Sequence, residues 1–163
     1  MQAVVRAVAL RLRAAGIPWR LAGSAALLVR GLPVRPGDID IEVAAADAVA
    51  AARTLGLPAP ARQAGGGWSS DRTVGQVAGV GIDLSGGLVV TGPGGTLRAM
   101  DAPVEKHGGI PLLPIGESLA RAMVAGSDAR RLKAMASLPD DPALRPRAIA
   151  YAESRAAAAS AAR

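Results

Sequence analysis

The hydrophobic and polar positions of the first 43 residues fall into four distinct patterns. Aliphatic residues recur over 2–15 at the spacing of an amphipathic helix, which a glycine and a proline then end. Residues 19–22 form a short apolar run of strand length, and an apolar helix is expected from 25 to 30. Residues 38–43 alternate acidic and aliphatic side chains, which predicts a strand with one face in the core.

The rest of the chain alternates between the same kinds of pattern. A helix is expected over 44–55, a loop over 60–70 and one or two strands over 73–84, interrupted near Gly79 and Gly81. A turn-rich hairpin region is expected over 86–95 and a short strand over 96–100. Residues 107–114 are expected to form a loop or an edge strand. Helical patterns dominate from Gly116 onward, with expected helices that include 130–137 and 143–159.

This order of elements predicts an α/β fold with a small mixed β-sheet, flanking helices and a helical C-terminal part. The length of 163 residues suits a single domain. We expect residues 1–115 to form the α/β core. Residues 116–163 should form a C-terminal helical segment that packs on the same domain.

Composition narrows the chemistry that the chain can perform. Aromatic residues make up only 2% of the chain, so the core must be aliphatic. There is no cysteine and one histidine, His107, which excludes thiolate chemistry and a histidine metal cluster. The site must therefore use carboxylates, hydroxyls, Lys and Arg. The lack of cysteine fits a cytoplasmic protein, and no run approaches the roughly 18 apolar residues of a membrane span.

The net charge of +6 is distributed unevenly. Residues 1–37 hold six arginines and no acid, residues 38–120 sum to −4, and residues 121–163 sum to +4. Basic segments that flank an acidic centre suggest a polyanionic partner such as RNA, DNA or a nucleotide. The alternative is an arginine-rich composition that serves solubility alone.

The first candidate for binding chemistry is the turn at Gly23 and Ser24, where the predicted strand meets the predicted helix. Free backbone N–H groups at a helix start bind anions, and a glycine lets a phosphate approach the backbone closely. The Ser24 hydroxyl can donate to a phosphate oxygen. The alternative is an ordinary turn in which Ser24 is the N-cap of the helix.

The second candidate is a group of three aspartates. Asp38 and Asp40 share one face of their strand, with Cα atoms roughly 7 Å apart, while Ile39 and Ile41 face the core. Two such carboxylates repel each other unless a cation lies between them, and Mg²⁺ is bound in this way together with substrate phosphates. Asp83 is framed by aliphatic residues in a later strand and completes a triad if the two strands are neighbours. The alternative is a solvated polar face.

Together these residues could catalyse a metal-dependent transfer reaction. Asp38 and Asp40 would hold Mg²⁺, with Mn²⁺ as the alternative ion, and Asp83 would share a metal and accept the proton of an attacking hydroxyl. The Gly-Ser turn, an Asp-x-Asp that begins fifteen residues after Gly23, and a later strand aspartate resemble the polymerase-β-type nucleotidyltransferase superfamily. The likeness is to its minimal and toxin-associated bacterial members. It implies an NTP substrate and NMP transfer to an RNA (tRNA) or protein hydroxyl, with a small molecule as the less favoured acceptor, and an antitoxin or helical partner.

A second likeness lies further along the chain. Residues 110–119 resemble the segment that leads to the C-terminal helix of the toxin-type relatives, where a lysine often follows; here that position holds Met123. Arg131 and Lys133 resemble an Arg-x-Lys motif of the relatives, whose next aspartate is replaced by Ala134. The resemblance implies that Arg131 and Lys133 contact the triphosphate. The alternative is basic decoration of a surface helix.

Other interpretations stay open at this level. The departures at Met123 and Ala134 allow a catalytically degenerate module that binds a nucleotide or a partner on the same fold. A hydrolase that uses paired carboxylates would explain the acids, but it leaves the Gly-Ser turn unexplained and lacks aromatics to stack sugars. His107 is expected at the surface, and the glycines at 65–67 form either a flexible loop or a flap over the site.

Overall fold

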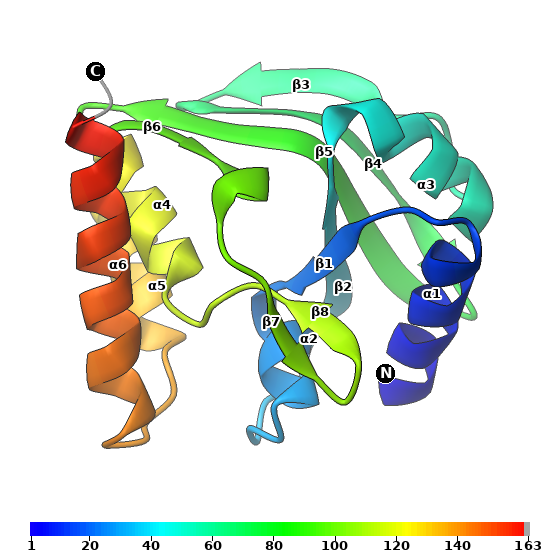
Figure 1. The fold of residues 1–163 in the computed structure, drawn as a ribbon, viewed down its shortest axis with the longest axis horizontal. Helices are drawn as coiled ribbons and strands as arrows, with labels where there is room; N and C mark the ends of the chain where they lie inside the picture. The colour runs from blue at the N-terminus through cyan, green and yellow to red at the C-terminus, as the bar shows by residue number, and fades with distance from the viewer. Residues whose placement is uncertain (162–163) are drawn as a thin grey trace.

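The computed structural model describes residues 1–161 and contains an eight-stranded mixed sheet (Figure 1). Seven strands follow the order β3-β4-β5-β2-β1-β8-β7, and β6 pairs with β5. The strands are β1 (Trp19–Ala22), β2 (Asp38–Val43), β3 (Ala61–Gly65), β4 (Trp68–Val77), β5 (Val80–Gly92), β6 (Gly95–Arg98), β7 (Glu105–His107) and β8 (Ile110–Leu112).

Within the described residues, six α-helices flank the sheet, together with two 3₁₀ turns, η1 (Ala45–Asp47) and η2 (Ala99–Asp101). The helices are α1 (Gln2–Ala14), α2 (Gly23–Val29), α3 (Ala48–Leu55), α4 (Glu117–Ala125), α5 (Asp128–Ala136) and α6 (Leu144–Ala161). The mixed α/β architecture with a helical C-terminal part is the one that the sequence predicts.

A first aliphatic core lies beneath α1 and α3. The helical spacing of Val5, Val8 and Leu12 turns these side chains toward the sheet, where they meet buried residues of β1, β2 and the first half of β5. Ile39 and Ile41 of β2 are buried in this core. The sequence prediction for both isoleucines is confirmed, and the acidic residues between them consequently lie on the other face of the sheet.

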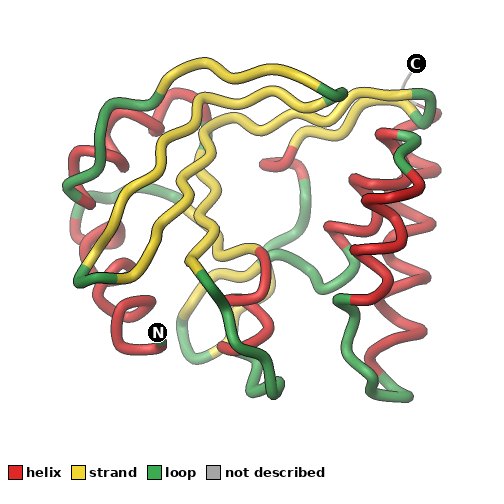
Figure 2. The backbone as a smooth tube through the Cα atoms, turned by 180° about the vertical axis from the view of Figure 1, so that it is seen from behind, coloured by secondary structure: helices red, strands yellow, loops and turns green. Residues whose placement is uncertain are grey.

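A second core lies at the other end of the molecule, between the C-terminal helices and the end of the long strand β5 (Figures 1 and 2). Val90 and Leu97 of β5 and β6 pack against small and aliphatic residues of α4 and α6. Only Ala134 of α5 is fully buried, so this helix lies on the surface of the helical part. The 13-residue β5 joins the two cores, since its first half pairs with β2 and its second half pairs with β6.

Two sequence predictions about the sheet are wrong. Residues 60–70 do not form a loop: β3 pairs with the start of β4, and the connecting turn is Gly66-Gly67. All five β3 residues are exposed, so this edge strand carries no alternation of hydrophobic and polar residues for a pattern to reveal. The expected hairpin over 86–95 begins later, because β5 continues to Gly92 before it turns. Residues 162–163 of the predicted helical segment lie outside the described residues.

Candidate active site

The three aspartates lie on two adjacent strands. Strand β2 pairs in parallel with β5, and Asp40 lies directly opposite Asp83 in that register. Asp38 lies opposite Gly81, and a Cβ on Gly81 would be in ordinary van der Waals contact with the Asp38 Cβ, 3.4 Å away. The expected neighbourhood of Asp83 and the Asp38–Asp40 pair is therefore present, and it depends on the β2–β5 register.

The turn at Gly23 is built around Asp40. Gly23 has φ of +60°, and a Cβ added there would lie 1.9 Å from Oδ2 of Asp40. Any side chain would displace the carboxylate, so the position needs glycine for both its backbone conformation and its contact. The close approach fixes the Asp40 carboxylate against the start of α2.

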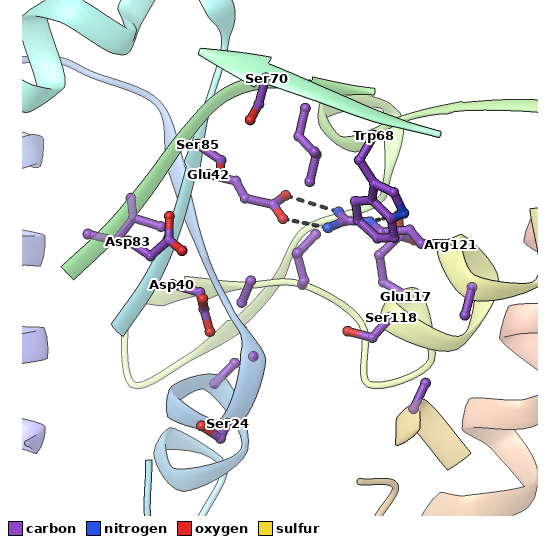
Figure 3. A pocket seen from close by; sticks show the side chains of 18 of the residues that line it. Ser24, Asp40, Glu42, Trp68, Ser70, Asp83, Ser85, Glu117, Ser118 and Arg121 are labelled. Carbon is purple, nitrogen blue, oxygen red and sulfur yellow. Dashed lines mark hydrogen bonds and ion pairs between the residues drawn. The ribbon is translucent and has the colours of Figure 1, made fainter. Parts of the chain in front are cut away.

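Ser24 is not the N-cap of α2, so the capping role that the alternative interpretation gave it is wrong. The helix begins one residue earlier, at Gly23, with Ala22 as its N-cap and no capping hydrogen bond from a side chain. Ser24 instead lines the cleft that contains Asp40 (Figure 3).

The pKa of Asp40 is raised from 3.8 to about 6. Burial is the largest cause, and the negative charges of Asp38, Asp83 and Glu42 add to it, while Arg72 lowers it. The carboxylates thus create a concentrated negative potential that the neighbouring arginine only partly offsets. A divalent cation would neutralise this potential.

Arg72 holds Asp83, and this role was not identified from the sequence. Its Nε donates to both Asp83 carboxylate oxygens, at 2.8 and 3.1 Å, and its Nη2 donates to Oδ2. A two-residue turn at 78–79 pairs Val77 with Val80, which places Arg72 diagonally across from Asp83. Counting back from this turn in the sequence would have predicted the pair.

The oxygen donors of the site fit a hard cation such as Mg²⁺. Among residues 1–161 no three acidic or histidine side chains are already gathered around one point, and Asp83 is turned toward Arg72. Asp38 and Asp40 would form the primary ligand pair, and Asp83 would join them on release from Arg72. The raised pKa of Asp40 is the observation in this chain that supports such a cation.

A buried ionic network ties β2 to the helical part of the chain. Arg121 of α4 donates to both carboxylate oxygens of Glu42, at 2.5 and 3.0 Å, and to Glu117 at 3.1 Å (Figure 3). The Tyr151 hydroxyl of α6 donates to Glu117 at 2.6 Å, and Arg155 lies 3.5 Å from the same carboxylate. Glu42 therefore serves this network, although the sequence places it on the same strand face as Asp38 and Asp40. The ion pairs raise the pKa of Arg121 despite its burial.

A cleft of about 920 Å³ extends from the carboxylates to the helical part. Asp38, Asp40, Asp83, Gly23 and Ser24 line one end. Trp68 of β4 lies at the opposite end (Figure 3), with Arg130 of α5 over its ring, and Lys133 of α5 also lines the cleft. The volume lies within the range of small-molecule sites.

The remaining residues that the sequence analysis singled out do not all line the cleft. Lys133 lines the cleft, whereas Arg131 is exposed on α5 outside the set of lining residues. Met123 is half-buried against the second core, and Ala134 is buried in it and also borders the cleft. His107 is exposed on β7 and lines a separate hollow beside α1. The glycines at 65–67 form the β3–β4 turn, and Gly65 borders the cleft.

Two solved structures are similar to this one. A candidate nucleotidyltransferase from Thermotoga maritima matches with a TM-score of 0.60 and 20% identity, over 69% of this chain and 76% of that one. The antibiotic-resistance factor ANT(2'')-Ia, a nucleotidyltransferase, matches with a TM-score of 0.52 and 12% identity, over 99% of this chain and 90% of that one. Neither a protein-family model nor the sequence of a curated protein matches the chain.

These likenesses define the class of fold. The chain has the nucleotidyltransferase fold, in agreement with the resemblance found in its sequence. No helix within the described residues is both long enough and apolar enough to cross a membrane.

Proposed function

We propose that the protein is a magnesium-dependent nucleotidyltransferase that transfers an NMP from an NTP to a hydroxyl group of RNA or protein. The observation that carries this proposal is the contact between Gly23 and Asp40, beside the parallel pairing of Asp40 with Asp83. It joins a turn suited to phosphate with a carboxylate group suited to Mg²⁺. The fold shared with a nucleotidyltransferase and a candidate nucleotidyltransferase supports it.

Each residue of the site has a role in the proposed reaction. Asp38 and Asp40 would hold the ion, and Gly23 and Ser24 would contact the phosphates. The bound ion would neutralise charge on the phosphates as pyrophosphate leaves. Asp83, now held by Arg72, would on release share the ion with the other two aspartates and accept the proton of the attacking hydroxyl.

Lys133 would contribute positive charge toward the triphosphate, since it lines the same cleft. Arg131 belongs to the proposed triphosphate contacts by its resemblance to the Arg-x-Lys motif, and it would need to turn toward the cleft to reach them. Mn²⁺ would replace Mg²⁺ at the same oxygen ligands.

The basic N-terminal segment favours an anionic acceptor. Residues 1–37 carry six arginines without an acid, and one of them, Arg30, lines the cleft. Positive charge of this kind attracts RNA and repels a polycationic small molecule. We propose tRNA or a protein as the acceptor, and a role as the toxin of a toxin–antitoxin pair whose partner covers the cleft.

The test is incubation with each α-³²P-NTP, Mg²⁺, bulk tRNA and cell lysate, beside the Asp38→Ala/Asp40→Ala double variant and an Asp101→Ala control. Asp101 lies in η2, is exposed and does not line the cleft. We expect label on RNA or protein with the wild type and the control, and none with the double variant. NTP binding without any transfer would favour the catalytically degenerate binding module instead.

A further inference from the structure

Arg130 is held in one orientation although it is exposed. Its guanidinium carbon lies 4.8 Å from the centroid of the Trp68 ring, and its Nη1 donates to the Gly66 carbonyl at 3.3 Å. Its backbone N–H donates to the Ser127 hydroxyl, the N-cap of α5, at 3.4 Å. The two side-chain contacts, both to the segment at Gly66 and Trp68, therefore orient the guanidinium at the rim of the cleft, and the backbone bond caps its helix.

The Trp68 ring beneath this guanidinium differs in its location from the other aromatic side chains. Trp68 is the single aromatic residue that lines the cleft within the described part of the chain, because Trp19 is buried in the first core and Tyr151 donates to Glu117. The Trp68 side chain is partly buried against the second core. One side of the guanidinium is thus covered by a ring anchored in the protein.

We propose that Arg130, stacked on Trp68, is the platform on which the nucleobase of the donor NTP stacks. This inference rests on the proposed function of the same cleft. Bases stack on arginine guanidinium planes as well as on aromatic rings, and a guanidinium that is already oriented loses little entropy on binding. The complex would contain three layers, in the order tryptophan, guanidinium and base.

The arrangement of the cleft assigns the base, rather than the phosphates, to Arg130. The carboxylates and the Gly23 turn lie at the opposite end of the cleft, where an ion would draw the triphosphate. Lys133 lies one helical turn after Arg130 on α5 and also lines the cleft, so it can supply a point charge to the phosphates. A delocalised, planar cation held over a ring is better suited to a base.

The test compares Arg130→Lys with the wild type in the binding of two probes, Mg-ATP and Mg-tripolyphosphate, by isothermal titration calorimetry. Lysine keeps the charge and removes the planar surface. We expect Arg130→Lys to weaken ATP binding by about tenfold, as for the loss of a stacked base, and to leave tripolyphosphate binding unchanged. Arg53→Lys, the same change at an exposed position of α3 outside the cleft, should alter neither.

Two outcomes would overturn the inference while leaving the proposed function in place. Equal ATP affinity for Arg130→Lys and wild type would show that no base stacks there. Equal weakening of ATP and tripolyphosphate would assign Arg130 to the phosphates. Failure of the wild type to bind either probe would overturn the inference and the proposed function together.

Discussion

The candidate site requires a glycine at position 23, next to Asp40. The left-handed backbone at Gly23 and the 1.9 Å that would separate its Cβ from Oδ2 of Asp40 are independent reasons for glycine. Gly16 offers a matched comparison, because its φ of +68° is similar but no atom lies within 4 Å of the position that a Cβ would take there.

We predict that Gly16→Ala and Gly23→Ala both lose about 1–2 kcal/mol of unfolding free energy from the left-handed backbone. Only Gly23→Ala should also weaken Mg-NTP binding, by at least about tenfold, because it displaces the Asp40 carboxylate. Urea denaturation and calorimetric titration of both variants measure the two effects. Equal NTP affinities for the two variants would contradict a role for the Gly23–Asp40 contact in binding.

Asp40 gives a pH-dependent prediction. Its pKa is raised in the folded protein, so its contribution to stability is fully present below the ordinary value of 3.8 and is lost as the pH rises through about 6. Without divalent cations, Asp40→Asn should therefore stabilise the protein at pH 8, by about 2 kcal/mol after allowance for solvent screening. At pH 4.5 the variant should have a much smaller effect.

Urea denaturation in EDTA at the two pH values measures this difference. The neighbouring Asp38, exposed on the same strand, provides the comparison variant Asp38→Asn. A stabilisation by Asp40→Asn that is equal at both pH values would show that charge repulsion at Asp40 is not its cause.

At the residue scale, the sequence predicted the aspartates and the Gly-Ser turn because each is a local pattern. The alternation of Asp38, Ile39, Asp40 and Ile41 predicts which side chains share a face, and burial of the two isoleucines confirms it. The Glu42–Arg121 pair could not be predicted in this way, since 79 positions separate its members and neither segment indicates its partner.

At the scale of elements, the network around Glu117 determines how the helical part is attached to the sheet. Arg121 connects β2 to α4, and Tyr151 and Arg155 connect α4 to α6 through the same buried carboxylate. Removal of Arg121 would leave Glu42 and Glu117 buried with fewer partners, and an uncompensated buried charge is strongly destabilising.

We predict that Arg121→Leu lowers the unfolding free energy by about 3–5 kcal/mol, as for other broken buried ion pairs. Arg62→Leu removes a surface pair with Asp71 at 3.6 Å and should cost less than about 1 kcal/mol. Chemical denaturation of both variants gives the comparison. A loss for Arg121→Leu as small as that for Arg62→Leu would show that the network does not hold the helical part on the sheet.

The sequence predicts most accurately those strands that bury side chains in the core. Strands β1 and β2 have the bounds that the sequence predicts, since each presents a clear pattern to the core. The exposed edge strand β3 was missed because its side chains are all solvated, so only its pairing with β4 defines it as a strand. Arg72 was missed for a separate reason, because the register of β4 and β5 was not counted back from the turn at 78–79.

At the scale of the whole molecule, two cores joined by β5 enclose one cleft. The first core supports the carboxylate end, and the second supports the cationic end with Trp68 and α5. The sequence predicted the fold class through the order of its elements, and the fold shared with a nucleotidyltransferase and a candidate nucleotidyltransferase agrees with it. It could not predict that Trp68 and Arg130 face the same cleft as Asp40, because that depends on how β4 and α5 pack across β5.

The most direct test of the proposed site measures Mg²⁺-dependent NTP binding by the wild type and by Asp38→Asn/Asp40→Asn, which keeps the shapes of the side chains and removes their charge. We predict that the wild type binds NTP with an affinity that rises with Mg²⁺. The double variant should lose this dependence and bind at least about tenfold more weakly. Mg²⁺-dependent binding that persists in the double variant, or no NTP binding by the wild type, would contradict the assignment of these carboxylates.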